Sequence, residues 1–116
     1  MERMITIATI EDFTKLDIRI GTVLKAEHLT GAKVPAITLE IDFGEEIGVK
    51  ASSAQITNRY EPDQLIGEQV VAVVNFPPRK IAGFTSEVLV IGGVPEKEDV
   101  VLLKPDMPLP NGTSVS

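Results

Sequence analysis

The chain has no cysteine and no tryptophan, and its 116 residues include a single histidine. Without cysteine it can form no disulfide framework, no thiolate nucleophile and no cysteine metal site. Long hydrophobic runs are also missing: MERMITIATIED at the start has no apolar region of signal-peptide length, and no later stretch reaches the ~18 residues typical of a membrane span. We therefore expect a cytoplasmic chain with no membrane insertion.

Aromatic and basic residues are both scarce. Aromatics make up 4% of the chain, so we expect a core built mainly from Val, Ile, Leu and Ala. Eleven Lys and Arg face seventeen Asp and Glu, and the net charge of −6 repels phosphates at long range. This balance argues against nucleic-acid binding over the whole surface but leaves room for a local basic patch. The length and the 43% of hydrophobic residues fit one globular domain over 1–116.

Short apolar segments with the period of strands run through the chain. In AITLEIDF (36–43) every second residue is apolar, and IGVKAS (47–52) follows after a GEEIG turn, which predicts a hairpin. Further strands are expected over 16–20, with a bulge or bend at Gly21, and over 69–74, 86–93 and 99–105. Five or six short strands with no alternation of strand and helix predict an all-β fold, and a small barrel is its simplest form.

Little helix is expected. Thr9 with Asp12 resembles a capping box, which predicts a short helix over about 10–15 with Ile10 and Phe13 on its buried side. Residues 53–68 favour one or two helical turns, since Pro62 suits a first turn and Gly67 a stop. The tail DMPLPNGTSVS (106–116) is turn-rich and is expected to follow the surface.

Two of the predicted strands are apolar on both sides. VVAVV (70–74) and VLVI (88–91) lack the alternation of a half-solvated strand, so both of their faces should be covered. A closed barrel covers one face. A helix, an extension of the chain or a second subunit has to cover the other, and the last alternative is a reason to expect a dimer.

No catalytic constellation is present in the sequence. His28 stands alone in an expected loop, and Ser52 and Ser53 lack the Gly-x-Ser-x-Gly context of an activated serine. Glu45 and Glu46 fit a solvated hairpin tip better than a metal or acid–base pair. We therefore expect no enzyme, no metal site and no cofactor, and the chain has no nucleotide-binding motif.

The segment NFPPRKIAGFTSEVLVIG (75–92) has the strongest features of a binding site. Pro77 and Pro78 stiffen the loop that carries Arg79 and Lys80, which lowers the entropy lost when those charges meet a ligand. Asn75 offers an amide that can read a base edge or hold the loop backbone. Phe76 and Phe84 are able to stack on bases or to pack in the core, and both alternatives stay open. Lys33, Lys50, Ser53 and Arg59 would widen the site if folding brings them to the same face.

This segment resembles the tRNA-binding domain family, which includes the C-terminal appendix of some methionyl-tRNA synthetases. The matching elements are Asn75, Pro78-Arg79-Lys80, Gly83 and Ser86-Glu87. The sequence is more similar to the CsaA branch, whose members are considered export-related chaperones. That likeness is carried by IDFGEEIGVKASSAQITNRY (41–60), by 75–93 and by DVVLLKPDMPLPNG (99–112). The resemblance implies a five-stranded oligonucleotide/oligosaccharide-binding (OB) barrel whose terminal extensions form a homodimer.

One departure from the family pattern bears on the ligand. The family commonly continues Ser-Glu-Gly-Met, with the Ser and Met implicated in tRNA contact, whereas this chain has Ser86-Glu87-Val88-Leu89. The change adds apolar side chains and favours a peptide over a base. The leading hypothesis is a homodimeric, ATP-independent chaperone for unfolded or pre-secretory polypeptides; the alternative is a tRNA-binding protein. The predicted site comprises Asn75, Phe76, Arg79, Lys80, Phe84, Ser86 and Leu89.

Overall fold

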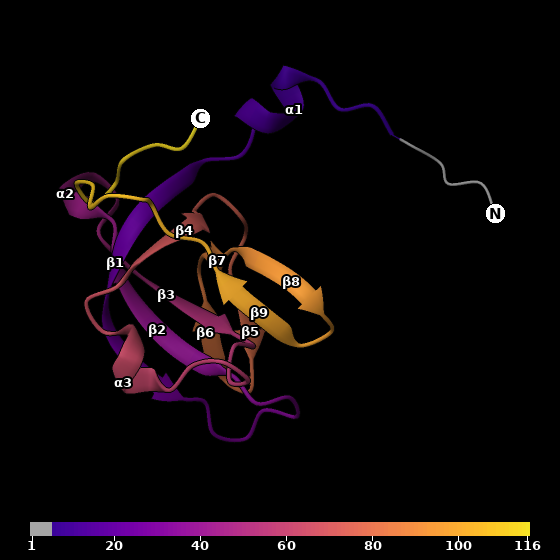
Figure 1. The fold of residues 1–116 in the computed structure, drawn as a ribbon, viewed down its shortest axis with the longest axis vertical. Coiled ribbons are helices and arrows are strands. Elements are labelled where there is room, and N and C mark those ends of the chain that lie inside the picture. Colours follow the sequence, from indigo (N-terminus) through magenta and orange to yellow (C-terminus); the bar gives the residue numbers. More distant parts are fainter. Residues whose placement is uncertain (1–5) are drawn as a thin grey trace.

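A long, bent strand organises the fold. The structure is a computed structural model that describes residues 6–116. Its strands are β1 (Ile18–His28), β2 (Ile37–Asp42), β3 (Val49–Ala54), β4 (Gln69–Val73), β5 (Arg79–Ile81), β6 (Phe84–Ser86), β7 (Leu89–Val90), β8 (Gly92–Glu96) and β9 (Asp99–Leu102). Three short helices, α1 (Ile10–Thr14), α2 (Gly44–Ile47) and α3 (Pro62–Leu65), complete it (Figure 1).

Five strands form one antiparallel sheet in the order β3-β2-β1-β4-β7. The first half of β1 pairs with β4, from Ile18 opposite Val73 onwards, and the second half pairs with β2, ending at His28 opposite Ile37. Because β1 changes partner along its length, the sheet curls on itself. The predicted five-stranded, all-β barrel is confirmed, and β2 and β3 form the predicted hairpin. Its second strand begins at Val49 and not at residue 47, because the connecting segment forms helix α2.

The bulge predicted at Gly21 forms slightly further along the strand. β1 runs through Gly21 without interruption, and its register with β2 shifts between Val23 and Lys25. A Cβ on Gly21 would lie 2.6 Å from the Ile41 side chain and 2.7 Å from the Phe43 ring. The glycine therefore allows β1 to approach the packed interior rather than to bend.

The barrel interior is filled by the aliphatic residues that the alternation singled out. Ile37, Leu39, Ile41 and Phe43 are at most 1% exposed. They pack with Val23, Ile56, Leu65 and Val70 in one cluster. The shortage of aromatics is thus met by branched side chains, and Phe43 is the one aromatic ring among the fully buried residues of this cluster.

A second, smaller cluster lies on the outer side of β1 and β4. Ile18, Ile20, Val71 and Val73 are buried there, with Val115 packed against them. The C-terminal tail reaches this position because its backbone bonds to the free edge of β1: Ile20 donates to Thr113, and Val115 donates to Ile18. Of the three covers considered for the two-sided strands, an extension of the chain covers this face of β4.

The N-terminal arm departs from expectation. Helix α1 forms with its capping box, since Thr9 and Asp12 exchange both bonds. The predicted burial of Ile10 and Phe13 is wrong, because they are 67% and 39% exposed. The helix projects away from the barrel (Figure 1), so within residues 6–116 this apolar side is left largely uncovered.

The region after β4 is also more divided than predicted. Residues 86–93 do not form one strand but belong to β6, β7 and β8, and the expected loop contains the β5–β6 hairpin. The hairpin turns at Ala82 and Gly83, both with positive φ, which is the geometry of a two-residue turn. Helical turns at α3, with Pro62 first, and strand β9 agree with the predictions.

Candidate functional site

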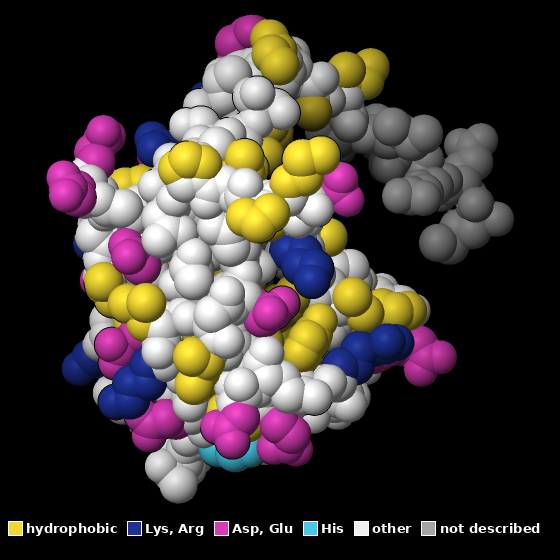
Figure 2. All heavy atoms as spheres, turned by 60° about the vertical axis from the view of Figure 1, so that its left-hand side comes forward, with side chains coloured by type: hydrophobic (Ala, Val, Ile, Leu, Met, Phe, Trp, Pro, Cys, Tyr) yellow, Lys and Arg dark blue, Asp and Glu magenta, His cyan; other side chains and the backbone are white. Residues whose placement is uncertain are grey.

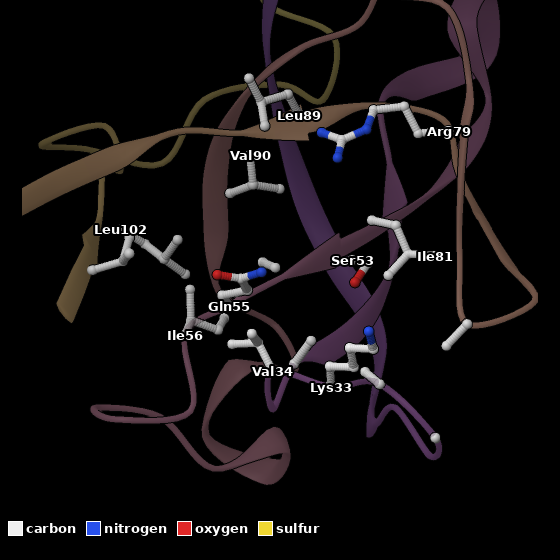
Figure 3. A pocket seen from close by; sticks show the side chains of 16 residues that line it. Lys33, Val34, Ser53, Gln55, Ile56, Arg79, Ile81, Leu89, Val90 and Leu102 are labelled. Atoms are coloured by element: carbon white, nitrogen blue, oxygen red, sulfur yellow. The ribbon is translucent and has the colours of Figure 1, made fainter. Parts of the chain in front are cut away.

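A groove of about 650 Å³ opens beside the end of β3 (Figure 3). Its walls come from the 31–36 loop, the β5–β6 hairpin, β7 and β9, and its floor includes Ser53, Gln55 and Ile56. Four residues of the predicted site and its wider set line it: Lys33, Ser53, Arg79 and Leu89. Segments far apart in the sequence therefore meet at one concave surface, as ligand sites usually require.

Arg79 and Lys80 do not act together. Successive side chains of a strand point to opposite faces. Arg79 and Ile81 line the groove, whereas Lys80, between them on β5, does not. The sequence placed both charges on one loop, but the hairpin brings only Arg79 to the cavity.

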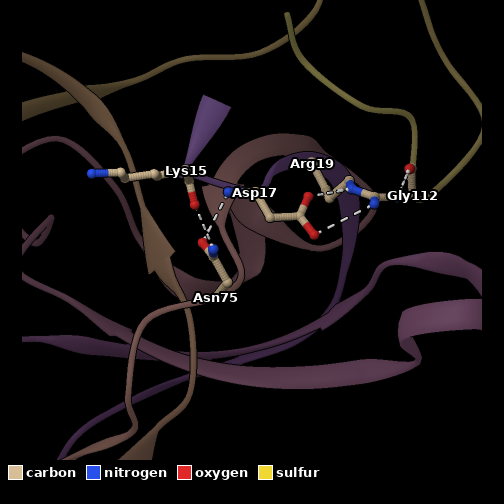
Figure 4. A network of polar contacts seen from close by, with 5 residues as sticks. All are labelled: Lys15, Asp17, Arg19, Asn75 and Gly112. Carbon is tan, nitrogen blue, oxygen red and sulfur yellow. Dashed lines mark hydrogen bonds and ion pairs between the residues drawn. The ribbon is translucent and has the colours of Figure 1, made fainter. Parts of the chain in front are cut away.

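Asn75 is engaged with the chain's own backbone (Figure 4). Its Oδ1 accepts from the Asp17 N–H at 2.9 Å, and its Nδ2 donates to the Lys15 carbonyl at 2.8 Å. The amide holds backbone, as the second of the two predicted roles required, but the backbone it holds is that of Lys15 and Asp17 and not that of its own loop. Asn75 thereby ties the end of β4 to the connection between α1 and β1.

The same connection carries an ion pair. The Asp17 carboxylate accepts from Arg19, and Arg19 also donates to the Gly112 carbonyl at 3.0 Å (Figure 4). The hydrogen bond to Asp17 is the main reason that the pKa of Arg19 is raised. These contacts bring the arm, β1 and the C-terminal tail together at one point.

Ser86 and Glu87 close the barrel. The Ser86 hydroxyl is buried and accepts from the Ser53 N–H at 3.0 Å, and the Glu87 carboxylate accepts from the Ala51 N–H at 3.0 Å. Glu87 and Val88 in turn donate their N–H groups to the Ala51 carbonyl. The Ser-Glu pair that matched the family pattern thus supplies bonds to β3 in place of a regular ladder.

The two phenylalanines of the predicted site lie outside the groove. Phe84 lines a separate hollow next to β1 and β2, together with Lys25, His28 and Thr38. Phe76 is 42% exposed in the segment before β5. No aromatic side chain lines the groove within residues 6–116.

Arg59 supports the groove from outside. Its guanidinium binds both carboxylate oxygens of Asp99, at 2.5 and 2.9 Å, and the neighbouring Tyr60 hydroxyl accepts from the Leu102 N–H. The hydrogen bond from Arg59 is the main cause of the lowered pKa of Asp99. Since Asp99 and Leu102 begin and end β9, these bonds fix the wall that β9 contributes. Lys50, on β3, does not line the groove.

The groove differs in charge from the rest of the molecule. Among its lining residues in the described part of the chain, none is acidic, whereas acidic side chains are spread over the face drawn in Figure 2. Lys33 and Arg79 make no ion pair within residues 6–116, unlike Arg19, Lys25, Arg59 and Lys104. An acidic protein therefore presents one apolar hollow edged by two free cations.

Sequence reasoning missed a large part of this surface. Gln55, Ile56, Val90, Val100 and Leu102 all line the groove. Only Val90 had a sequence signal: VLVI (88–91) is apolar on both sides, which predicts a barrel wall whose other face lines the groove or the dimer interface. Nothing in the sequence pattern marked Gln55, Ile56, Val100 or Leu102. Within residues 6–116 no three His, Asp or Glu side chains lie close enough together to hold a metal ion. None of the helices in the same range is long and apolar enough to cross a membrane.

Comparison with known proteins gives matches over nearly the whole chain. Residues 18–114 match the family described as "Putative tRNA binding domain". The crystal structure of chaperone CsaA from Bacillus anthracis is 67% identical, covers 96% of this chain and 100% of its own, and superposes with a TM-score of 0.91. The CsaA chaperone from Picrophilus torridus is 46% identical, with 95% and 100% covered and a TM-score of 0.87.

The curated relatives are longer proteins. The methionine–tRNA ligase of Methanococcoides burtonii is 38% identical over 107 residues, which are 92% of this chain and 15% of the ligase. The chain thus spans a small part of such relatives. The resemblance to CsaA inferred from the sequence is confirmed, and the barrel is the OB-type fold of these chaperones. The chain belongs to the tRNA-binding domain family.

Proposed function

We propose that the chain is an ATP-independent chaperone that acts by binding, not by catalysis, and holds unfolded or pre-secretory polypeptides in the groove. The observation that carries the proposal is the lining of the groove. Ile56, Leu89 and Leu102 are apolar, Lys33 and Arg79 are cations without an ion pair within residues 6–116, and none of the described lining residues is acidic. A polypeptide segment with an apolar centre and flanking carboxylates complements such a surface, since burial of the apolar side chains drives association.

A second candidate, tRNA, is supported by the family match. Proteins that bind single-stranded nucleic acid usually stack bases on aromatic side chains. The aromatic side chains in residues 6–116 lie outside the groove, and Asn75 and Ser86 are already bonded within the chain. These features favour the polypeptide, with tRNA as the alternative ligand of the same cations.

We further propose that the protein acts as a homodimer in the cytoplasm. The arm exposes Ile7, Ile10, Phe13 and Leu16, and yellow hydrophobic side chains stand exposed at this end of the molecule (Figure 2). An amphipathic helix with its apolar side uncovered needs a partner surface. Two grooves on one dimer would bind a long unfolded chain with higher avidity than either groove alone.

The test compares two exposed leucines. Leu89 lines the groove and is 43% exposed; Leu24 on β1 is 49% exposed and does not line it. In a light-scattering assay without ATP, the native protein should suppress aggregation of a chemically unfolded client. Leu89→Glu should lose most of this protection, whereas Leu24→Glu should keep it. Equal behaviour of the two variants would refute the assignment of the groove.

The tRNA alternative has its own measurement. Binding through phosphates should weaken with salt, with a slope of about −0.7 per phosphate contact for single strands. Tight tRNA binding with such a slope, lost in Arg79→Glu, together with no protection of the client by the native protein, would favour tRNA over polypeptide.

A further inference from the structure

The barrel is not closed along its whole length. β3 and β7 are the two edges of the five-stranded sheet, and the four antiparallel pairings between them make these edges run parallel. They meet where the Ala51 carbonyl accepts from the Glu87 and Val88 N–H groups. The closure thus begins as a parallel pairing of β3 with the segment that leads into β7.

The next hydrogen bond of this pairing is not made. Along one strand of a parallel ladder, bonding groups recur every second residue. Two residues beyond the bond from the Val88 N–H to the Ala51 carbonyl, the next bond would join the Val90 N–H to the Ser53 carbonyl. Within residues 6–116 no backbone hydrogen bond joins these two residues. Side chains take the neighbouring groups instead: Ser86 accepts from the Ser53 N–H, and the Ser52 hydroxyl donates to the Val88 carbonyl.

Both unpaired positions face the groove. Ile91 donates to the Val71 carbonyl, and Leu89 lies opposite Val73, so the backbone of Val90 between them points away from β4. On β3, the N–H groups of Ala51 and Ser53 donate to Glu87 and Ser86, on the side of the strand that faces away from β2. The carbonyl of Ser53 points to this same side of β3. Ser53 and Val90 both line the groove, on its β3 and β7 sides (Figure 3). The groove is therefore the open end of the β3–β7 seam.

We propose that a bound polypeptide enters this seam as an extended strand, hydrogen-bonded through its backbone to Val90 and to the Ser53 carbonyl. Addition of a strand to an open edge is a recurrent mode of peptide recognition, and backbone bonds make it tolerant of sequence. Lys33 and Arg79 then contact acidic side chains of the same segment, and Leu89 contacts its apolar ones. The inference rests on the proposed function and specifies how the client is bound.

Amide hydrogen exchange measured by NMR tests the inference. The probe is a capped synthetic peptide with alternating leucine and valine in its centre and a glutamate near each end. Saturating peptide should slow exchange of the Val90 amide by about tenfold or more, because this N–H becomes hydrogen-bonded. Lys80 is the matched control: its amide also points away from its partner strand, on the β5 edge outside the groove, and should not change.

A second peptide separates backbone recognition from side-chain recognition. The same sequence with N-methyl groups on its central amides should bind about tenfold or more weakly, since it loses backbone donors of the inserted strand. If the first peptide binds but leaves Val90 exchange unchanged, or if both peptides bind equally, strand insertion is overturned while the proposed function stands. If an oligonucleotide protects Val90 equally well, the seam does not select polypeptide and the inference fails. If no peptide binds, the proposed function fails and the inference with it.

Discussion

Replacement of Arg79 by glutamate should weaken binding of the acidic-ended peptide, and replacement of Lys80 should not. The two residues are adjacent, both are exposed, and both have free charges within residues 6–116. They differ in the face of the hairpin on which they lie, because Arg79 lines the groove and Lys80 does not. The two variants make the same change of charge at neighbouring positions. A difference in peptide binding between them therefore reports whether the charge faces the groove.

The magnitude follows from the exposure of Arg79. A ligand carboxylate about 5 Å from an exposed guanidinium gains ~0.8 kcal/mol in water, and charge reversal turns this gain into an equal loss. At ~0.15 M salt the Debye length of ~8 Å roughly halves the total, which leaves about 0.9 kcal/mol, or an approximately fivefold change in Kd. At ~0.01 M salt the change should approach tenfold, and at ~1 M it should fall below about twofold.

Fluorescence anisotropy of the labelled peptide at these three salt concentrations measures the effect. Arg79→Glu should show the graded loss. Lys80→Glu should follow the native protein within about twofold at ~0.15 M and ~1 M salt, and at ~0.01 M it should lose clearly less than Arg79→Glu, since the ~30 Å Debye length then lets charges outside the groove act on the ligand. Equal weakening by the two variants would show that the whole hairpin, and not its groove face, attracts the ligand. A loss in Arg79→Glu that does not shrink with salt would contradict the electrostatic explanation.

Three other changes test the structural parts of the site. Asn75→Ala removes two hydrogen bonds to backbone groups of Lys15 and Asp17 and should lower the free energy of unfolding by about 1–2 kcal/mol in urea titrations. Unchanged stability would contradict this structural role and favour contact of Asn75 with the ligand. Arg59→Met should raise the pKa of Asp99 in a carboxyl NMR titration, because the hydrogen bond from Arg59 is the main cause of its lowering. Because Arg59 lowers that pKa in the native protein, the contribution of the Arg59–Asp99 pair to stability is present above about pH 4 and is lost as pH falls through the lowered pKa. If Arg59→Met unfolded in acid with the same profile as the native protein, the pair would not contribute to stability. Phe13→Glu should convert a dimer of twice 12.5 kDa into a monomer in sedimentation experiments, while a native protein that sediments as a monomer at micromolar concentration would refute the dimer itself.

The sequence by itself determined the elements whose residues interact locally or follow a clear period. The alternation in 36–43 specified β2 because one face of that strand is entirely buried, and a shift by one residue would expose all of its apolar side chains. Thr9 and Asp12 determined the start of α1 in the same way, since both partners of the cap lie within one turn. The scarcity of aromatics likewise predicted the aliphatic core.

The tertiary structure decided everything that depends on residues distant in sequence. Gly21 is required by Ile41 and Phe43, about twenty residues away, and no local pattern reveals such a contact. Asn75 and Ser86 matched a family pattern for ligand contact, yet their partners are the arm and β3. Arg79 and Lys80 lie on opposite faces because the β5–β6 hairpin makes this segment a strand, and the loop composition of the sequence does not reveal that pairing. The open seam between Ser53 and Val90 has no sequence signal. It lies between β3 and β7, which are the two edges of the sheet and are joined only through β2, β1 and β4.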